Sequence, residues 1–155
     1  MTKKILMVCL GNICRSPLAE GILKSKLTTD FYVDSAGIGG WHSGEQPDQR
    51  AIKTASNKGI SISNQKARKI SVADFDKFDV LYAMDKENLK ELLLLAPNES
   101  GKRKVKLLLN EAYPNQNDDV PDPYYGDLED FESVFTLLEN ALEIIATKIK
   151  KTANQ

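Results

Sequence analysis

The stretch Ile5–Gly21 reads ILMVCLGNICRSPLAEG and joins two kinds of secondary structure. Ile5–Val8 is a continuous apolar run with β-branched members, closed by Gly11, which is typical of a strand buried in a parallel sheet. Ser16 is the expected N-cap of a helix, and Pro17 suits its first position. The apolar residues that then recur at helical spacing are Leu18, Ile22, Leu23 and Leu27. The stretch therefore predicts a strand, a tight loop and a helix.

The same alternation continues along the chain. Further strands are expected within Asp30–Gly37, Phe78–Asp85 and Lys104–Asn110, and helices within Pro47–Gly59, Lys86–Pro97 and Glu129–Lys151. Alternating strands and helices favour a parallel sheet with helices on both faces. We therefore predict a single-domain α/β fold over residues 1–155, built on four parallel strands, with residues 152–155 frayed.

Composition narrows the classes of function. The chain has 155 residues, and 21 Lys and Arg against 22 Asp and Glu give a net charge of −1. This balance argues against bulk electrostatic binding to nucleic acid or to an anionic membrane. The apolar runs ILMVCL and LLLLA fall far short of the roughly 20 residues that span a bilayer. Two cysteines cannot build a secreted disulfide framework, so we expect a soluble cytoplasmic protein.

The cysteine loop, Cys9–Ser16, reads CLGNICRS. A helix N-terminus offers unpaired N–H groups and a partial positive charge, and Gly11 allows the loop to curl around an oxyanion. Arg15 brings a planar guanidinium that suits two phosphate oxygens. Cys9 would lie at the base of this cradle, where the positive field favours a nucleophilic thiolate. The loop lacks the Gly-Lys-Ser/Thr ending of a Walker loop, so we predict a covalent acceptor for phosphorus.

Loops after parallel strands meet at one edge of a sheet. We therefore expect Cys9, Trp41, Asp85 and the long irregular stretch Asn110–Leu128 to lie near one another. That stretch contains DDVPDPYYGDLED, in which prolines hold Asp122 on a stiff backbone. Asp122 is our candidate acid and base, although it could simply cap a turn. The rival acids are Asp118, Asp119, Asp127 and Asp130, which spacing alone does not exclude.

Five segments occur in a characteristic order: VCLGNICRSPLAEG, DSAGIGGWHSGEQPDQRA, KARKI, MDKENL and DPYYGD. Together they resemble the low-molecular-weight protein tyrosine phosphatases nearly from end to end. The resemblance implies a flavodoxin-like fold and hydrolysis of phosphotyrosine in a protein substrate, with a tyrosine kinase as one candidate. It implies no metal or cofactor, and neither nucleic acid nor a membrane is an expected partner.

The resemblance also implies roles for matching residues. Cys9 would take the phosphoryl group, Arg15 would bind it, and Asp122 would protonate the leaving group and then activate water. The residues expected to form the substrate site are Leu10, Gly11, Asn12, Ile13, Cys14, Ser16, Trp41, Tyr124 and Tyr125. Within this set, Asn12 and Ser16 would also order the loop.

Two supporting residues are expected outside the loop. Ser35, in DSAG, resembles a family serine in the network of Asn12. Many members carry a histidine before the Lys-Ala-Arg segment, bonded to the loop asparagine, whereas this chain has Gln65. Glutamine can still form hydrogen bonds, so we expect a modest change in loop support.

Cys14 has two interpretations: a small residue that fills the loop, or, as the resemblance suggests, a thiol that traps oxidised Cys9 in a reversible disulfide. Two alternative functions also stay open. The first is a thiol-dependent arsenate reductase, although the chain has no further cysteine to relay a disulfide. The second is a phosphate-binding module without turnover. Arsenate turnover and p-nitrophenyl phosphate hydrolysis would distinguish these functions.

Overall fold

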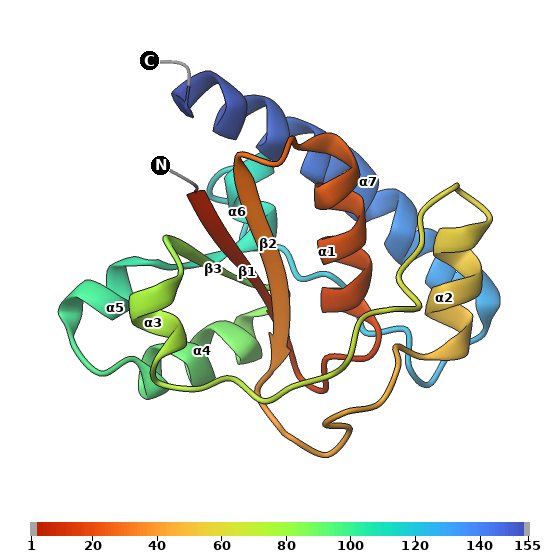
Figure 1. The fold of residues 1–155 in the computed structure, drawn as a ribbon, viewed down its shortest axis with the longest axis horizontal. Helices are drawn as coiled ribbons and strands as arrows, with labels where there is room; N and C mark the ends of the chain where they lie inside the picture. The colour runs from red at the N-terminus through yellow and green to blue at the C-terminus, as the bar shows by residue number, and fades with distance from the viewer. Residues whose placement is uncertain (1–2, 154–155) are drawn as a thin grey trace.

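The strands form one parallel sheet in the order β2-β1-β3-β4, seen in the computed structural model, which describes residues 3–153 (Figure 1). Their bounds are β1 Lys3–Cys9, β2 Phe31–Gly37, β3 Val80–Ala83 and β4 Val105–Leu107. The register pairs Cys9 with Gly37, so the first two strands end together. The four-stranded parallel sheet predicted from the sequence is confirmed.

Helices cover both faces of this sheet (Figure 1). Their bounds are α1 Arg15–Lys26, α2 Gln49–Ser56, α3 Asp74–Lys77, α4 Lys86–Leu95, α5 Glu99–Arg103, α6 Leu108–Ala112 and α7 Leu128–Ala153. On one face, Ile5 and Met7 of β1 pack with apolar side chains of α1 and α7. On the other face, Leu6 and Val8 belong to a cluster with Phe75 of α3 and Leu92 of α4. Successive side chains of β1 point to opposite faces of the sheet, so the strand contributes to two hydrophobic cores.

The start of α1 differs from the expectation. The helix begins at Arg15 with Cys14 at its N-cap, and no side chain caps it. The prediction that Ser16 caps the helix is wrong, because the Ser16 hydroxyl lies within hydrogen-bond distance of the Cys9 sulfur and the Asn12 side chain. The loop therefore uses this hydroxyl for its own internal order.

The fourth strand is also shorter than the expected Lys104–Asn110. It ends at Leu107, and Leu108–Ala112 forms α6. A run of leucines fits a buried strand and a buried helix equally well, so periodicity could not find this boundary. The short helices α3 and α5 were missed for a related reason, since four or five residues are too few to display a helical period.

The long final helix was predicted correctly in kind and position. α7 buries Phe131, Phe135, Leu138, Leu142 and Ile145 along one face. It continues through Ala153, and residues 154–155 of the expected frayed end lie outside the described residues. None of the helices described between residues 3 and 153 has the length and apolarity needed to cross a membrane.

Candidate active site

The cysteine loop lies across the carboxyl ends of β1 and β2. The Cys9 carbonyl accepts a hydrogen bond of 2.9 Å from the Ile38 N–H, and the Leu10 carbonyl accepts one of 2.9 Å from the Gly39 N–H. A Cβ atom at Gly37 would lie 3.0 Å from the Gly11 carbonyl carbon and about as close to the Asn12 nitrogen. The loop can rest on the end of β2 because no side chain separates them.

Asn12 organises the interior of the loop. Its φ of 59° is left-handed, a conformation that asparagine tolerates better than most residues. Its Oδ1 accepts a hydrogen bond of 3.0 Å from the Arg68 N–H, while its Nδ2 donates to Ser16 Oγ at 2.8 Å and to Ser35 Oγ at 2.9 Å. The expected network of Asn12 with both serines is therefore present.

Cys9 lies at the base of the loop, and the residue is 3% exposed. The Asn12 N–H donates to its sulfur at 3.3 Å, and Ser16 Oγ lies 3.0 Å away. Hydrogen bonds from the backbone and a hydroxyl stabilise a thiolate more than a neutral thiol. The surroundings of Cys9 therefore suit a nucleophilic sulfur.

Arg15 is buried and held from behind. Its Nη1 donates to Asp85 Oδ2 at 2.6 Å and to the Val120 carbonyl at 2.9 Å, while Nη2 lies 3.6 Å from Asp122 Oδ2. Burial alone would lower the pKa of Arg15, but the nearby Cys9, Asp85 and Asp122 raise it above its ordinary value. The guanidinium thus remains charged beside the nucleophile.

Asp85 was expected at this edge of the sheet but was absent from the candidate site residues. It is the N-cap of α4, where its Oδ1 accepts a hydrogen bond of 2.7 Å from the Asn88 N–H. Its other oxygen accepts from Arg15. The sequence MDKENL contains the cap signal, but only the tertiary structure places this carboxylate against Arg15.

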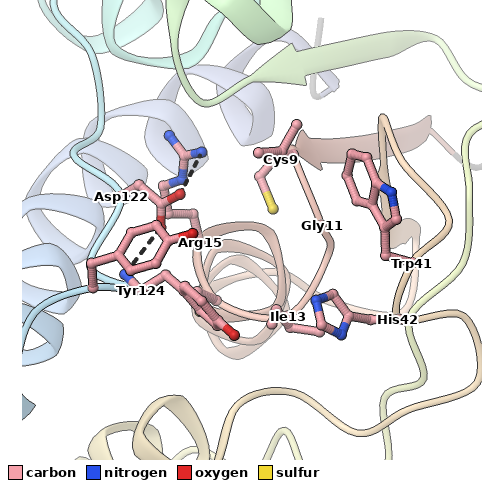
Figure 2. A pocket seen from close by; sticks show the side chains of 11 residues that line it. Cys9, Gly11, Ile13, Arg15, Trp41, His42, Asp122 and Tyr124 are labelled. Carbon is pink, nitrogen blue, oxygen red and sulfur yellow. Dashed lines mark hydrogen bonds and ion pairs between the residues drawn. The ribbon is translucent and has the colours of Figure 1, made fainter.

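Asp122 is the one acid of the long loop that lines the pocket with Cys9 and Arg15 (Figure 2). Its Oδ1 accepts a hydrogen bond of 3.1 Å from the Tyr124 N–H. The rival acids lie elsewhere. Asp118 is exposed, Asp119 pairs with Lys86, and Asp127 and Asp130 hydrogen-bond to each other's backbone N–H groups at the start of α7.

The pocket has a volume of about 250 Å³. Figure 2 shows the Cys9 sulfur with Arg15 and Asp122 on one side and Trp41 and His42 on the other. The lining residues are Cys9, Leu10, Gly11, Ile13, Cys14, Arg15, Trp41, His42, Asp122, Tyr124 and Tyr125. His42 was not among the candidate site residues, because an isolated histidine in a loop gives no sequence signal. In the structure its Nδ1 lies 2.9 Å from Glu45 Oε2, within hydrogen-bond distance.

Tyr124 and Tyr125 line one side of the pocket, and Arg50, which was not among the candidate site residues, holds their segment in place. Arg50 donates to the Tyr124 carbonyl at 2.9 Å and to the Gly126 carbonyl at 2.8 Å. Its guanidinium carbon lies 4.5 Å from the centroid of the Phe131 ring. Asp48, the N-cap of α2, holds the same guanidinium at 2.9 Å. Helix α2 therefore positions the loop that carries Asp122.

Four expected site residues lie behind the pocket or at its margin. Asn12, Ser16 and Ser35 form the network beneath the loop. Gln65 donates to the Pro17 carbonyl at 3.1 Å, and its buried Oε1 has no hydrogen-bond partner among the described residues. The Asn12 oxygen instead accepts from the Arg68 backbone, so Gln65 supports the beginning of α1 rather than the asparagine.

Cys14 lines the pocket and, like Cys9, is a free thiol. Burial raises the pKa of the Cys14 thiol, and the negative charges of Asp48, Cys9 and Asp122 raise it further. Cys14 therefore stays protonated at neutral pH. Across residues 3–153, no group of three or more His, Cys, Asp or Glu side chains has the arrangement of a metal site.

Comparison with known proteins agrees with this geometry. Residues 4–155 match the family model for low molecular weight phosphotyrosine protein phosphatases. The chain is 41% identical over 140 residues to low molecular weight phosphotyrosine protein phosphatase 1 of Drosophila melanogaster, covering 87% of this chain and 89% of that protein. It is 40% identical over 152 residues to the low molecular weight protein-tyrosine-phosphatase YfkJ of Bacillus subtilis, covering 95% and 96%.

A solved structure gives the same result. The crystal structure of a protein tyrosine phosphatase from Entamoeba histolytica, with Hepes in its active site, superposes with a TM-score of 0.90. The two chains are 37% identical, and the match covers 98% of this chain and 99% of the other. The chain therefore belongs to the low molecular weight phosphotyrosine protein phosphatase family.

Proposed function

We propose that this chain hydrolyses phosphotyrosine in protein substrates through a phosphocysteine intermediate on Cys9. One observation carries the proposal: a single pocket holds a buried thiol that receives hydrogen bonds, a clamped guanidinium and a carboxylate. These are the three groups that phosphoryl transfer through a covalent intermediate requires.

In the first step, the Cys9 thiolate attacks phosphorus and the bond from phosphorus to the tyrosine oxygen breaks. Asp122, protonated at this stage, donates its proton to that oxygen. Arg15 stabilises charge on the phosphoryl oxygens through Nη2, because Nη1 is already committed to Asp85 and Val120. The products of this step are the free tyrosine side chain and phosphocysteine.

In the second step, water attacks phosphorus and the sulfur–phosphorus bond breaks. Asp122, now a carboxylate, takes the proton from water, and inorganic phosphate leaves with Cys9 restored as a thiolate. The hydrogen bonds from Asn12 and Ser16 stabilise the thiolate as a leaving group. One carboxylate thus acts first as an acid and then as a base.

The pocket walls support an aromatic substrate. Ile13, Trp41 and Tyr124 offer apolar surface around the opening, with Tyr125 beside them. The rings of Tyr124 and Tyr125 meet edge to face, with their centroids 5.0 Å apart. A flat phenyl ring between such walls would place its phosphate at the buried Cys9, whereas the shorter side chain of phosphoserine reaches less deeply.

The first experiment measures p-nitrophenyl phosphate hydrolysis by the wild type and by Cys9→Ser. We expect activity to be lost in the variant, because serine is a far poorer nucleophile at neutral pH. Trapping the phosphorylated wild-type enzyme by rapid acid quench should place phosphorus on Cys9. Retained turnover in Cys9→Ser would refute the mechanism.

The second experiment assigns the acid. Asp122→Ala should lose rate mainly with phenyl phosphates whose phenols have a high pKa, because those leaving groups depend most on protonation. Asp118→Ala is the matched control, an exposed acid in the same loop, and should behave as the wild type. Equal losses with good and poor leaving groups would contradict the assigned role.

We further propose a cytoplasmic phosphoprotein as the substrate, with a tyrosine kinase as one candidate. The proposed chemistry needs a reduced Cys9, and both cysteines are free thiols, which supports a reducing compartment. Cys9→Ser should bind phosphotyrosine proteins without turning them over. Captured proteins that are released by added phosphate, and that do not bind the double variant Cys9→Ser with Arg15→Ala, would identify the substrate.

A further inference from the structure

A buried carboxylate lies behind the cysteine loop and has no part in the chemical steps proposed above. Glu20, on α1, is 3% exposed. Its Oε1 accepts a hydrogen bond of 2.7 Å from the Ser35 hydroxyl, and its Oε2 accepts one of 2.6 Å from the Lys24 ammonium. Burying a carboxylate is costly unless it is paired, so its presence calls for a reason.

The hydrogen bonds between Glu20 and the nucleophile have a defined direction. A backbone N–H can only donate, so the Arg68 N–H fixes Oδ1 of Asn12 on its side and turns Nδ2 toward the two serines. Each serine oxygen therefore accepts from Asn12 and keeps one hydrogen to donate. Ser35 donates its hydrogen to Glu20, and Ser16 is left to donate to the Cys9 sulfur at 3.0 Å.

We propose that Glu20 is a positioning residue that keeps this hydrogen-bond chain directed toward the Cys9 thiolate, a role that rests on the proposed function of Cys9. An ionised carboxylate can only accept, so it holds the Ser35 hydrogen away from Asn12. Without that acceptor, the buried Ser35 hydroxyl has to find another. The nearest is the Asn12 oxygen, which Ser35 can reach only if the amide turns against the Arg68 N–H, and such a turn would also draw the Ser16 hydrogen away from the sulfur.

Lys24 is the group that favours the ionised form of Glu20. Burial raises the pKa of Glu20 above its ordinary value, and the hydrogen bonds from Lys24 and Ser35 limit that rise. The other charged groups around Glu20 are Asp34, on β2, and Lys66, which lines the same surface cavity. Lys24 is half exposed, so the chain of hydrogen bonds runs from the surface to the nucleophile.

The test follows the rate at which iodoacetate alkylates Cys9 as the pH is varied, because this reaction reports the thiolate without any phosphatase turnover. The titratable residues that line the pocket with Cys9 stay unchanged in every variant; they are Cys14, Arg15, His42, Asp122, Tyr124 and Tyr125. Glu20→Met keeps the side-chain length but removes the acceptor. We expect its alkylation midpoint to move up by about one pH unit, the scale of a weakened hydrogen bond to a charged group.

Rescue and control variants separate positioning from general stability. Glu20→Gln keeps an acceptor oxygen for Ser35 and should move the midpoint by less than half as much as Glu20→Met. Lys26→Met is the matched control, since it breaks ion pairs of α1 with Glu139 and Glu143 that have no link to the loop. Its midpoint should equal that of the wild type even if its melting temperature falls.

A coupling measurement keeps the proposal testable if Glu20→Met does not fold. The isosteric Glu20→Gln should move the midpoint in a chain with Ser35 and should have no effect in a Ser35→Ala chain. An equal effect in both backgrounds, or a folded Glu20→Met with the wild-type midpoint, would overturn the proposal. Phosphatase activity in Cys9→Ser would instead overturn the proposed function, so the two failures are distinguishable.

Discussion

At the scale of single residues, the conformation of the Arg15 side chain is fixed by hydrogen bonds to Asp85 and Val120, which lie on two other segments. A free arginine side chain has many conformations, and ordering it on binding phosphate would cost conformational entropy. Asp85 and the Val120 carbonyl fix it before any ligand arrives. Part of the cost of binding the phosphoryl group is therefore met during folding.

The contribution of Asp85 can be measured with Asp85→Asn. Asparagine still caps α4, so the change removes a charge while keeping the cap. We expect kcat/KM for p-nitrophenyl phosphate to fall by about 10-fold to 100-fold, the range for one charge-assisted hydrogen bond. The lost negative charge would otherwise favour phosphate binding, so a fall isolates the positioning of Arg15. Asp119→Asn is the control, and an unchanged kcat/KM in Asp85→Asn would contradict the argument.

The left-handed backbone at Asn12 makes a second prediction at this scale. Glycine adopts a φ near 59° without strain, whereas alanine does not. Urea denaturation should show Asn12→Ala less stable than Asn12→Gly by about 1–2 kcal/mol. Both variants lose the side-chain network, so both should lose activity.

A second left-handed asparagine supplies the comparison. Asn115 has a φ of 66° and is exposed, away from the pocket. The same Ala and Gly substitutions there should reproduce the stability difference with wild-type activity. A more stable alanine variant at residue 12 would show that backbone strain is not the deciding factor.

At the scale of elements, α2 acts as a clamp on the long loop. Asp48 caps the helix and holds Arg50, which in turn binds the carbonyls of Tyr124 and Gly126. The side chain of Arg50 also packs against Phe131 of α7. The first turn of a short helix therefore decides where the loop of the candidate acid runs.

This clamp predicts a pH dependence of stability. Hydrogen bonds from Arg50 hold the pKa of Asp48 below its ordinary value, although burial opposes them. The unfolded chain binds the proton more tightly, so the stabilisation is complete above about pH 4 and is lost as the pH falls through the folded-state pKa. Asp48→Asn should thus cost about 1 kcal/mol at pH 7.

The measurement is urea denaturation of both proteins from pH 7 down to pH 3. The gap in free energy of unfolding should narrow steadily below about pH 4, as the pH approaches the lowered folded-state pKa of Asp48. A gap that stays constant over this range would assign the effect to the helix cap alone. Glu132→Gln, a change at an exposed acid of α7, gives the baseline for removing a surface carboxylate.

The sequence predicted those elements whose pattern is local. β1 and α1 could be found because an apolar run, a glycine and a helical period follow one another within Ile5–Gly21. The boundary between β4 and α6 could not, because Leu107 and Leu108 are equally apolar and only packing separates them. The prediction also assigned the Ser16 hydroxyl to the helix N-cap, whereas this group contacts Cys9 and Asn12 within the loop. A hydroxyl at this position can do either, and the sequence does not show which.

The same division applies to the site. The pairing of Cys9 with Arg15 could be read from one loop. The stiff backbone around Asp122 made it the candidate acid, but spacing did not exclude the other acids of its loop. Asp85 and Arg50 act through contacts with segments distant in the chain, and no local spacing encodes such contacts. The residues to which we assign the chemistry could thus be named from the sequence, whereas the residues that hold them in place needed the structure.

At the scale of the whole molecule, the site lies where three strand ends meet, and ligand binding should stabilise the entire fold. Inorganic phosphate would bind the folded cradle and not the unfolded chain, so stability rises with its concentration. At 100 times its dissociation constant, phosphate should add about 2.7 kcal/mol and raise the melting temperature by roughly 5–10 °C.

Differential scanning fluorimetry with phosphate, against potassium chloride at equal ionic strength, measures this shift. Arg15→Ala should abolish it, because the cradle then lacks its fixed cation. Cys9→Ser should retain it, since the loop and its N–H groups remain. An identical rise in all three proteins would mean that phosphate acts as a general stabilising salt.

The hydrogen bonds of Arg15 with Asp85 and Val120 also affect when the site can form during translation. Asp85 lies 70 residues and Val120 lies 105 residues beyond Arg15. A ribosome has therefore produced the whole nucleophile loop long before the groups that hold its arginine exist. The N-terminal part of the nascent chain carries the complete signature motif but not the assembled cradle. The cradle is therefore assembled only after Val120 has emerged and α7 can pack against the sheet.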